Sequence, residues 1–190
     1  MKQGLPQGSV LSPLLFILLI YKLAELLPPN ALVAMFADDV TLLATHVDKR
    51  EAEKEVQTLV DIVALWSKQW KLTLNAGKCE ACFFSTDPKE ANWSPSIIID
   101  GRTIKHEPTP RLLGVTLDRT LCFATHTANV TKSAASKLKI LAKLVYTDWG
   151  GNKFELFRIY QAIVKSKLDY AAPAWQPWLS DTQFNKLEVV

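Results

Sequence analysis

The hydrophobic pattern at the start of the chain predicts a buried helix. A turn-rich lead-in, Gly4-Leu-Pro-Gln-Gly8, precedes eleven mostly apolar residues from Val10 to Ile20. Serine is a favoured N-cap and proline is tolerated at the first helical position, so Ser12 and Pro13 predict a helix from Pro13 to about Leu27. Its first two turns are apolar on all sides, so we expect both faces to be covered. The run is shorter than the roughly 20 residues of a membrane helix.

Two short apolar runs follow, and they predict a β-hairpin. They span residues 31–36 and 40–44 and are split by Ala37-Asp38-Asp39, which gives the hairpin a tight acidic turn. Next, Asp48 and Glu51 have the spacing of a capping box, and apolar residues recur at helical intervals up to Trp66 and Trp70. We therefore expect a helix from about residue 48 to 71, with one face packed on a sheet.

The middle of the chain predicts further strands. Strands are expected at 72–74 and 81–84 around an Asn75-Ala-Gly77 turn, and a hairpin over 97–104 is indicated by Asp100-Gly101, a strong two-residue turn signal. Another strand is expected at 112–117.

After Thr125 the periodicity becomes helical. One stripe is apolar and consists of Val130, Ala134, Leu138, Leu141 and Val145. Gly150-Gly151 is expected to end this helix. Asn152 with Glu155 predicts the cap of a second helix reaching about residue 168, and Ser180 the cap of a third. The change of pattern near residue 120 is the expected subdomain boundary.

Composition and charge narrow the class of protein. The chain has 190 residues and is 48% hydrophobic, enough to bury a core and to exclude wholesale disorder. Formal net charge is +3, but the positive charge is concentrated in residues 132–167, which hold eight basic and two acidic side chains. Three cysteines, an odd number, argue against a disulfide-stapled secreted domain, so we expect a nuclear or cytoplasmic protein that is not secreted and not bound to a membrane.

The acidic turn is the central chemical feature. Neighbouring strand residues point to opposite faces, but a turn lets Asp38 and Asp39 present their oxygens at one point on a dry, rigid base. Such oxygen ligands suit Mg²⁺ or Mn²⁺. Taken alone, Asp-Asp is more often an ordinary solvated turn, because aspartate is a common turn residue.

Four segments in a fixed order favour the metal-site interpretation over the solvated turn. They are residues 4–16 with Pro-Gln-Gly, Phe36-Ala-Asp-Asp39, Leu74-Asn-Ala-Gly-Lys78 and Leu112-Leu-Gly-Val-Thr-Leu-Asp118. The series resembles the palm of reverse transcriptases, specifically of the non-LTR (LINE-type) retrotransposons, over nearly the whole chain from motif B to motif E. A match of this kind remains a hypothesis about structure and chemistry.

The resemblance implies roles for individual residues. Asp38 and Asp39 would hold two catalytic Mg²⁺ or Mn²⁺ ions, and Phe36 would lie near the primer end, where many relatives have tyrosine. Pro6, Gln7 and Gly8 would form the loop against the template and the incoming nucleotide, since glycine allows close backbone approach and an amide both donates and accepts.

Other implied roles have simpler alternatives. Lys78 would neutralise or protonate the leaving pyrophosphate, or it is a solvated turn lysine. Leu113 and Gly114 would form the hairpin that grips the primer, or they belong to a buried strand. Lys132, Lys139 and Lys143 share one helix face, and they would follow nucleic-acid phosphates or form a plain solvated face.

The expected architecture is α+β. Residues 1–120 would form a partial palm with an antiparallel sheet backed by helices, and residues 121–190 a helical thumb-like region truncated at its C-terminus. Only three residues precede Gly4, so the motif A strand with its third metal carboxylate, and the fingers, are expected to lie in an upstream segment of the same polyprotein.

The implied function is RNA-directed DNA synthesis. The enzyme would be a nucleotidyltransferase that extends a DNA primer on an RNA template with deoxynucleoside triphosphates, and the isolated chain is expected to be inactive because a two-metal site needs more ligands than one turn supplies. The alternative, from a different class, is a catalytically dead retroelement remnant that only binds nucleic acid or a partner protein.

Overall fold

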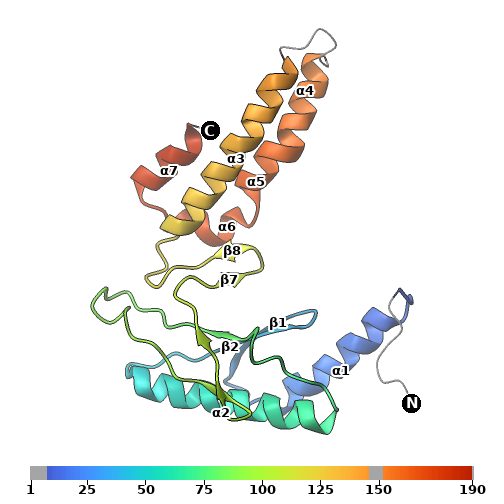
Figure 1. Cartoon of the computed structure of the whole chain (residues 1–190), viewed down its shortest axis with the longest axis vertical. Coiled ribbons are helices and arrows are strands. Elements are labelled where there is room, and N and C mark those ends of the chain that lie inside the picture. The colour runs from blue at the N-terminus through green and yellow to red at the C-terminus, as the bar shows by residue number, and fades with distance from the viewer. Residues whose placement is uncertain (1–7, 146–151, 190) are drawn as a thin grey trace. The chain divides into compact units, whose positions relative to one another are not determined.

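The chain divides into two compact units in a computed structural model that describes residues 8–145 and 152–189 (Figure 1). The first unit comprises Met1–Ala81 and Pro95–His106, and the second comprises Cys82–Ser94 and Glu107–Val190. The division therefore differs from a single break near residue 120. One reason is a backbone hydrogen bond from Ser85 N to Arg119 O, which ties the 82–94 segment to the second unit at 3.0 Å.

The first unit packs two helices against a hairpin. Its helices are α1 (Ser12–Leu26) and α2 (Lys49–Gln69), and its strands are β1 (Leu32–Phe36), β2 (Asp39–Leu43), β3 (Glu80–Ala81), β4 (Ile98–Ile99), β5 (Arg102–Thr103) and β6 (Lys105–His106). A core of Leu23 and Leu27 with α2 residues Leu59, Val63 and Trp66 lies under the β1–β2 hairpin. The predicted hairpin and both helices are confirmed.

Helix α1 departs from the prediction in two ways. Ser12 is the first helical residue and not the cap, because Leu11 occupies the cap position and supplies no side-chain hydrogen bond. The helix is also not covered on both faces. Its C-terminal half reaches the core, with Leu23 buried and Leu19 and Ile20 packed against the cluster. An apolar set that lies mostly in the first half of the helix is exposed, namely Leu14, Leu15, Ile17, Leu18 and Tyr21.

The N-terminus of α2 is capped as expected, with a different second partner. Asp48 Oδ1 accepts a hydrogen bond from Arg50 N at 2.8 Å. The reciprocal bond comes from His46, whose Nδ1 accepts from Asp48 N at 3.0 Å, while Glu51 pairs with Lys54. At the other end Trp70, predicted to be in the core, is exposed.

The strands form four separate two-stranded sheets among the described residues, and not one antiparallel sheet. The β4–β5 hairpin around Asp100-Gly101 is confirmed. Residues 72–74 are not a strand, and β3 is limited to Glu80–Ala81, which pairs in parallel with Lys105–His106 of β6. Pairing with a distant segment replaces the predicted local hairpin.

The second unit is mainly helical. It contains β7 (Arg111–Leu112), β8 (Val115–Thr116), α3 (Ala124–Val145), α4 (Lys153–Tyr160), the π-helical turn η1 (Gln161–Lys165), α5 (Ser166–Asp169), α6 (Ala172–Trp175), the 3₁₀ turn η2 (Gln176–Trp178) and α7 (Asp181–Glu188). Helix α3 packs along α4 and α5 and also contacts α7 (Figure 1). The predicted strand at 112–117 is instead a hairpin, with its turn at Leu113–Gly114.

Local capping signals hold well in this unit. Asn152 and Glu155 form a complete capping box at α4. At α7, Gln183 Oε1 accepts a hydrogen bond from Ser180 N at 3.0 Å, which is one half of such a box. In the apolar stripe of α3, Ala134 and Leu141 are buried and Val130 and Leu138 half-buried. The side chain of Val145 and the expected stop at Gly150-Gly151 lie outside the described residues.

Candidate active site

The acidic residues lie at the tip of the β1–β2 hairpin. The antiparallel register pairs Phe36 with Asp39, so the connection consists of Ala37 and Asp38. Ala37 takes a φ of 52°, a left-handed conformation that costs a residue with a Cβ roughly 1–2 kcal/mol. The turn is therefore tight and strained, and it fixes where the two carboxylates leave the backbone.

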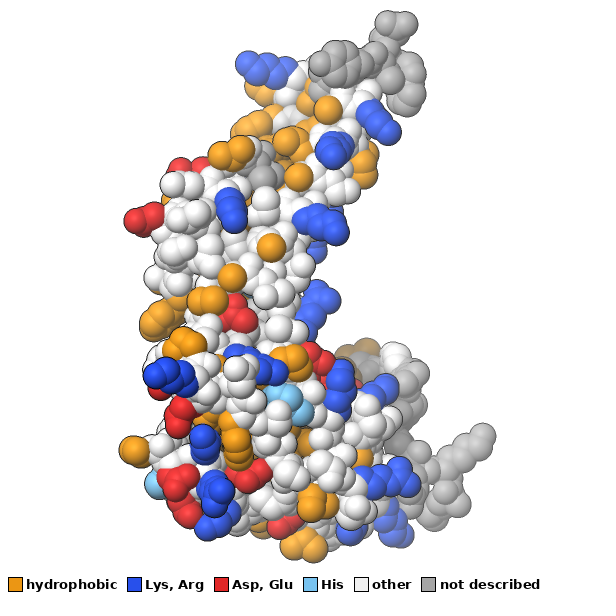
Figure 2. All heavy atoms as spheres, turned by 60° about the vertical axis from the view of Figure 1, so that its left-hand side comes forward, with side chains coloured by type: hydrophobic (Ala, Val, Ile, Leu, Met, Phe, Trp, Pro, Cys, Tyr) orange, Lys and Arg blue, Asp and Glu red, His pale blue; other side chains and the backbone are white. Residues whose placement is uncertain are grey.

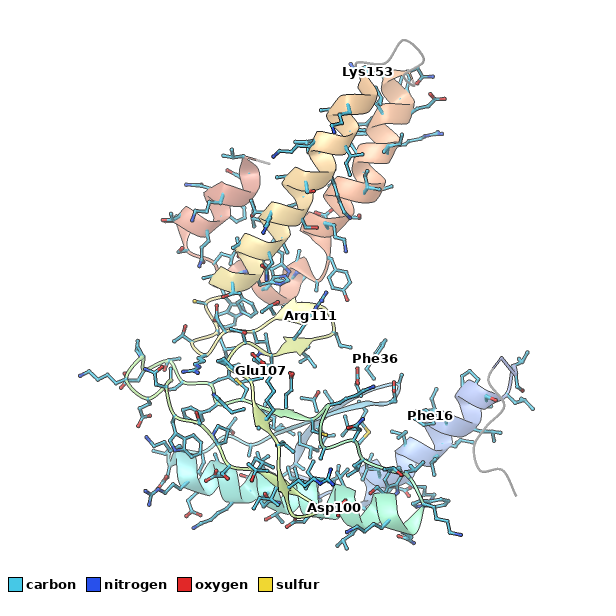
Figure 3. All side chains as sticks on the ribbon, in the orientation of Figure 1. Phe16, Phe36, Asp100, Glu107, Arg111 and Lys153 are labelled. Carbon is cyan, nitrogen blue, oxygen red and sulfur yellow. The ribbon has the colours of Figure 1, made fainter. Side chains whose placement is uncertain are left out.

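The two faces of this hairpin have different environments. Val33, Met35, Val40 and Leu42 pack against the core between α1 and α2. Because side chains alternate along a strand and paired residues share a face, Phe36 and Asp39 project from the opposite face. Figure 3 shows Phe36 pointing away from α2, and 63% of its surface is exposed.

The carboxylates of Asp38 and Asp39 are both exposed, and neither has a hydrogen-bond or ion-pair partner among the residues that the structure describes. Two such oxygen-rich groups fit a hard divalent cation. Within residues 8–145 and 152–189, no cluster of three or more acidic, histidine or cysteine side chains is placed to hold a metal ion. The hairpin therefore offers part of a metal site.

The loop before α1 is described only from Gly8 onward, and Pro6 and Gln7 lie outside the described residues. Gly8 is exposed and has a φ of 88°, in the region that favours glycine. A Cβ added at Gly8 would meet no atom within 4 Å. The backbone here is open to a ligand on the side where a side chain would project.

Lys78 closes a turn of the first unit. Its backbone N donates to Asn75 O at 2.9 Å, and Asn75 Oδ1 accepts from Gly77 N at 3.1 Å. The Lys78 side chain is exposed and forms no ion pair with any described residue, Asp38 and Asp39 included. The structure confirms the turn and leaves the chemical role of Lys78 a prediction.

Leu113 and Gly114 form the two-residue turn between β7 and β8, with φ values of 45° and 87°. Leu113 is exposed. A Cβ on Gly114 would lie 3.1 Å from Cε1 of Tyr170, a tight contact, so packing within the protein also favours glycine here. This is a second reason for the small residue, beside the predicted approach of a primer.

Three of the lysines of α3 lie on one helical face. Lys132, Lys139 and Lys143 are exposed and have no ion-pair partner among the described residues. Lys132 also borders a hollow of about 560 Å³ between α3 and α7, together with Lys186. On the face drawn in Figure 2, Lys and Arg side chains are spread along the helices of the second unit.

Three residues that the sequence did not single out for function support the Leu113–Gly114 turn. They are His126, Tyr170 and Trp175, all in the second unit. Trp175 belongs to a proline- and tryptophan-rich stretch, residues 173–178, which has no regular hydrophobic periodicity. No local pattern links these residues to a turn that lies 57 positions before Tyr170.

None of the helices in residues 8–145 and 152–189 combines the length and the apolar character needed to cross a membrane. Cys79, Cys82 and Cys122 are free thiols. Burial raises the pKa of the Cys82 thiol to about 11.

Comparison with known proteins identifies the family. The reverse transcriptase (RNA-dependent DNA polymerase) family matches residues 1–117, and the chain belongs to this family. The resemblance predicted from the four motifs is confirmed.

Relatives come from mobile elements of insects. The chain is 29% identical over 196 residues to the RNA-directed DNA polymerase from mobile element jockey of Drosophila funebris, covering 98% of this chain and 21% of that protein. It is 31% identical over 153 residues to the probable RNA-directed DNA polymerase from transposon BS of Drosophila melanogaster, covering 76% and 17%. The chain thus spans about a fifth of the length of these relatives. No solved structure matches it.

Proposed function

We propose that this chain forms part of the polymerase site of an RNA-directed DNA polymerase for retrotransposition, with Asp38 and Asp39 as metal ligands. The observation that supports this most directly is their position. The two exposed carboxylates lie at the tip of a hairpin whose other face packs in a core, and they have no partner within residues 8–145 and 152–189. That hairpin lies within the 117 residues that match the family.

In this proposal each part of the site has a distinct task. Asp38 and Asp39 hold Mg²⁺ or Mn²⁺ ions, which when bound lower the cost of deprotonating the primer 3′-OH and stabilise charge on the transferred phosphoryl group. Phe36 offers an apolar surface beside Asp39 for the terminal sugar. Lys78 carries positive charge toward the leaving pyrophosphate.

The substrates follow from the same assignment. The template is RNA, the primer is DNA, and the added units are deoxynucleoside triphosphates. Pro6, Gln7 and Gly8 contact the template and the nucleotide, while the turn at Leu113 and Gly114 contacts the primer. The hairpins up to residue 120 act as a partial palm, and the helices that follow act as the thumb.

The site needs a further carboxylate and a nucleotide-binding region beyond these 190 residues. A two-metal site would need ligands from more than one turn. The described residues bring no third ligand to Asp38 and Asp39. The homologous proteins are about five times as long, which leaves room for these parts in the parent protein.

Primer extension tests this proposal at two lengths. The purified 190-residue chain is expected to give no measurable Mg²⁺-dependent incorporation on an RNA template. A longer polymerase that carries these residues is expected to be active. Robust incorporation by the short chain would contradict the proposed division of the site. Duplex binding without any incorporation by the longer protein would instead favour a remnant that only binds nucleic acid.

A further inference from the structure

The turn between β7 and β8 is held by a side chain from far along the sequence. Tyr170 Oη donates a hydrogen bond to Leu113 O at 2.7 Å, across 57 positions. The same ring lies against Gly114, where a Cβ would come within 3.1 Å of Cε1. Each strand of this hairpin has only two residues, so its own ladder gives the turn little support.

Tyr170 is itself fixed at its backbone. Trp175 Nε1 donates to Tyr170 O at 3.0 Å, and Trp175 is completely buried. Between them Ala171 takes a φ of 52°, which turns the chain sharply before α6. The indole and the tight turn together set the direction in which Tyr170 leaves the backbone.

The other end of the hairpin is held by His126 of α3. Its Nδ1 accepts a hydrogen bond from Thr116 N at 3.2 Å, and its ring meets the Trp175 ring edge-on with centroids 4.9 Å apart. Only 4% of His126 is exposed. Tyr170, Trp175 and His126 therefore form one connected support that reaches both the turn and the strand that follows it.

What this support holds is an exposed and strained turn. Leu113 is 48% exposed. Its φ of 45° is also unfavourable for a residue with a bulky side chain. A turn of this kind has other accessible conformations unless its surroundings select one. Its rigidity does not serve core packing, because the Leu113 side chain contributes little to the core. A fixed, exposed backbone is instead what a ligand-contacting turn requires.

We infer that Tyr170 is a positioning residue for the primer: its hydroxyl, backed by Trp175 and His126, fixes the Leu113–Gly114 turn in the conformation that receives the primer terminus. This inference rests on the proposed function, in which that turn contacts the primer. Tyr170 acts through the turn and does not itself touch reacting atoms.

The informative substitution is Tyr170→Phe in a polymerase that carries this chain. It removes the hydroxyl and keeps the ring against Gly114, so folding is expected to be preserved. Loss of one neutral hydrogen bond is expected to raise KM for the primer–template about threefold to tenfold, with kcat at saturating duplex and KM for the nucleotide unchanged. Tyr170→Ala is expected to have the larger effect on both KM and thermal stability.

Tyr160→Phe is the matched control. Tyr160 lies in the same unit and stacks on Phe157, and its hydroxyl has no hydrogen-bond partner among the described residues. An unchanged primer–template KM in Tyr170→Phe, or an equal rise in Tyr160→Phe, would overturn the inference.

A second readout separates this inference from the proposed function. Duplex affinity measured by fluorescence anisotropy needs no catalysis. If the wild-type protein shows no extension that depends on Asp38, the proposed function fails. Weaker binding of a recessed-end duplex by Tyr170→Phe, with fully single-stranded RNA bound as before, would still support Tyr170 as a positioning residue. Equal binding of the duplex by the variant and the wild type would reject it.

Discussion

Phe36 and Asp39 face each other across the last pair of the β1–β2 hairpin, and both side chains project from the face opposite the core. A large exposed ring thus lies beside one of the two carboxylates, at a position where burial in this unit does not require an aromatic residue. A ligand that approaches the acidic turn would therefore contact Phe36 and Asp39 on the same face of the hairpin.

Phe36→Tyr is therefore expected to be tolerated. The added hydroxyl meets solvent on an exposed face, so the melting temperature should change little, in line with surface substitutions that usually stay within about 0.5 kcal/mol. Primer extension by the parent polymerase should stay within about threefold of wild type, because the aromatic ring is kept and only a hydroxyl is added; threefold corresponds to about 0.65 kcal/mol in the barrier. A large loss of stability in calorimetry would mean that Phe36 is packed and that the two-faced description of the hairpin is wrong.

Gly114→Ala is expected to destabilise the protein more than Gly101→Ala. Both glycines have positive φ, 87° and 76°, so both variants carry backbone strain of about 1 kcal/mol. Of these two, only at Gly114 does the new Cβ also crowd a neighbour, the ring of Tyr170 at 3.1 Å, whereas nothing lies within 4 Å at Gly101. Urea unfolding of the two variants gives the comparison, and equal losses would argue against the Tyr170 contact.

The α3 lysines are expected to contribute to duplex binding through phosphate contacts. If Lys132, Lys139 and Lys143 each neutralise a phosphate, each alanine substitution should flatten the dependence of log affinity on log salt by about 0.7–0.9. The effect should not depend on template sequence, because phosphate contacts position without specifying.

Titration of a labelled duplex at several salt concentrations measures this slope for the triple variant. Lys89→Ala serves as the control, since Lys89 is exposed and lies in the second unit outside α3. An unchanged slope in the triple variant would leave the three lysines as a solvated face.

The free energy of unfolding is expected to fall as the pH falls from about 7 to about 5, partly because of His126. Burial, and next the guanidinium of Arg111, lower the pKa of His126 below its ordinary 6.5. Below that pH the unfolded chain takes up a proton that the native imidazole resists, so protonation favours the unfolded state.

His126→Gln should make stability less dependent on pH in this range, because the amide still accepts from Thr116 N but does not titrate. Denaturant unfolding at several pH values is the measurement, with His46→Gln as the control at an exposed histidine. A pH dependence identical in His126→Gln and wild type would assign the effect to other groups.

The elements that the sequence predicted correctly are those determined within a few residues. The capping box of Asn152 and Glu155, the Asp100-Gly101 turn and the acidic hairpin each depend on neighbours in the chain. The two carboxylates could be found for the same reason, because they are adjacent and lie in a motif of fixed order.

The features that escaped prediction depend on distant segments. The parallel pairing of β3 with β6 and the bond between Tyr170 and Leu113 are set by tertiary packing, which overrides local β-propensity. Burial also depends on distant segments. Both α1 and Trp70 are apolar enough to lie in a core, but among the described residues only the C-terminal half of α1 packs in one, and Trp70 is exposed.

The most direct test of the account is primer extension on an RNA template by a reverse transcriptase that carries these residues, comparing wild type with Asp38→Ala. Loss of a catalytic metal ligand is expected to reduce activity by several orders of magnitude. The melting temperature should be unchanged, because Asp38 is exposed and has no partner in the described part of the chain. Glu188→Gln serves as the control: it removes a carboxylate at the end of α7, and the variant should retain full activity. Substantial Mg²⁺-dependent extension by Asp38→Ala would contradict the assignment of the β1–β2 hairpin as the catalytic site.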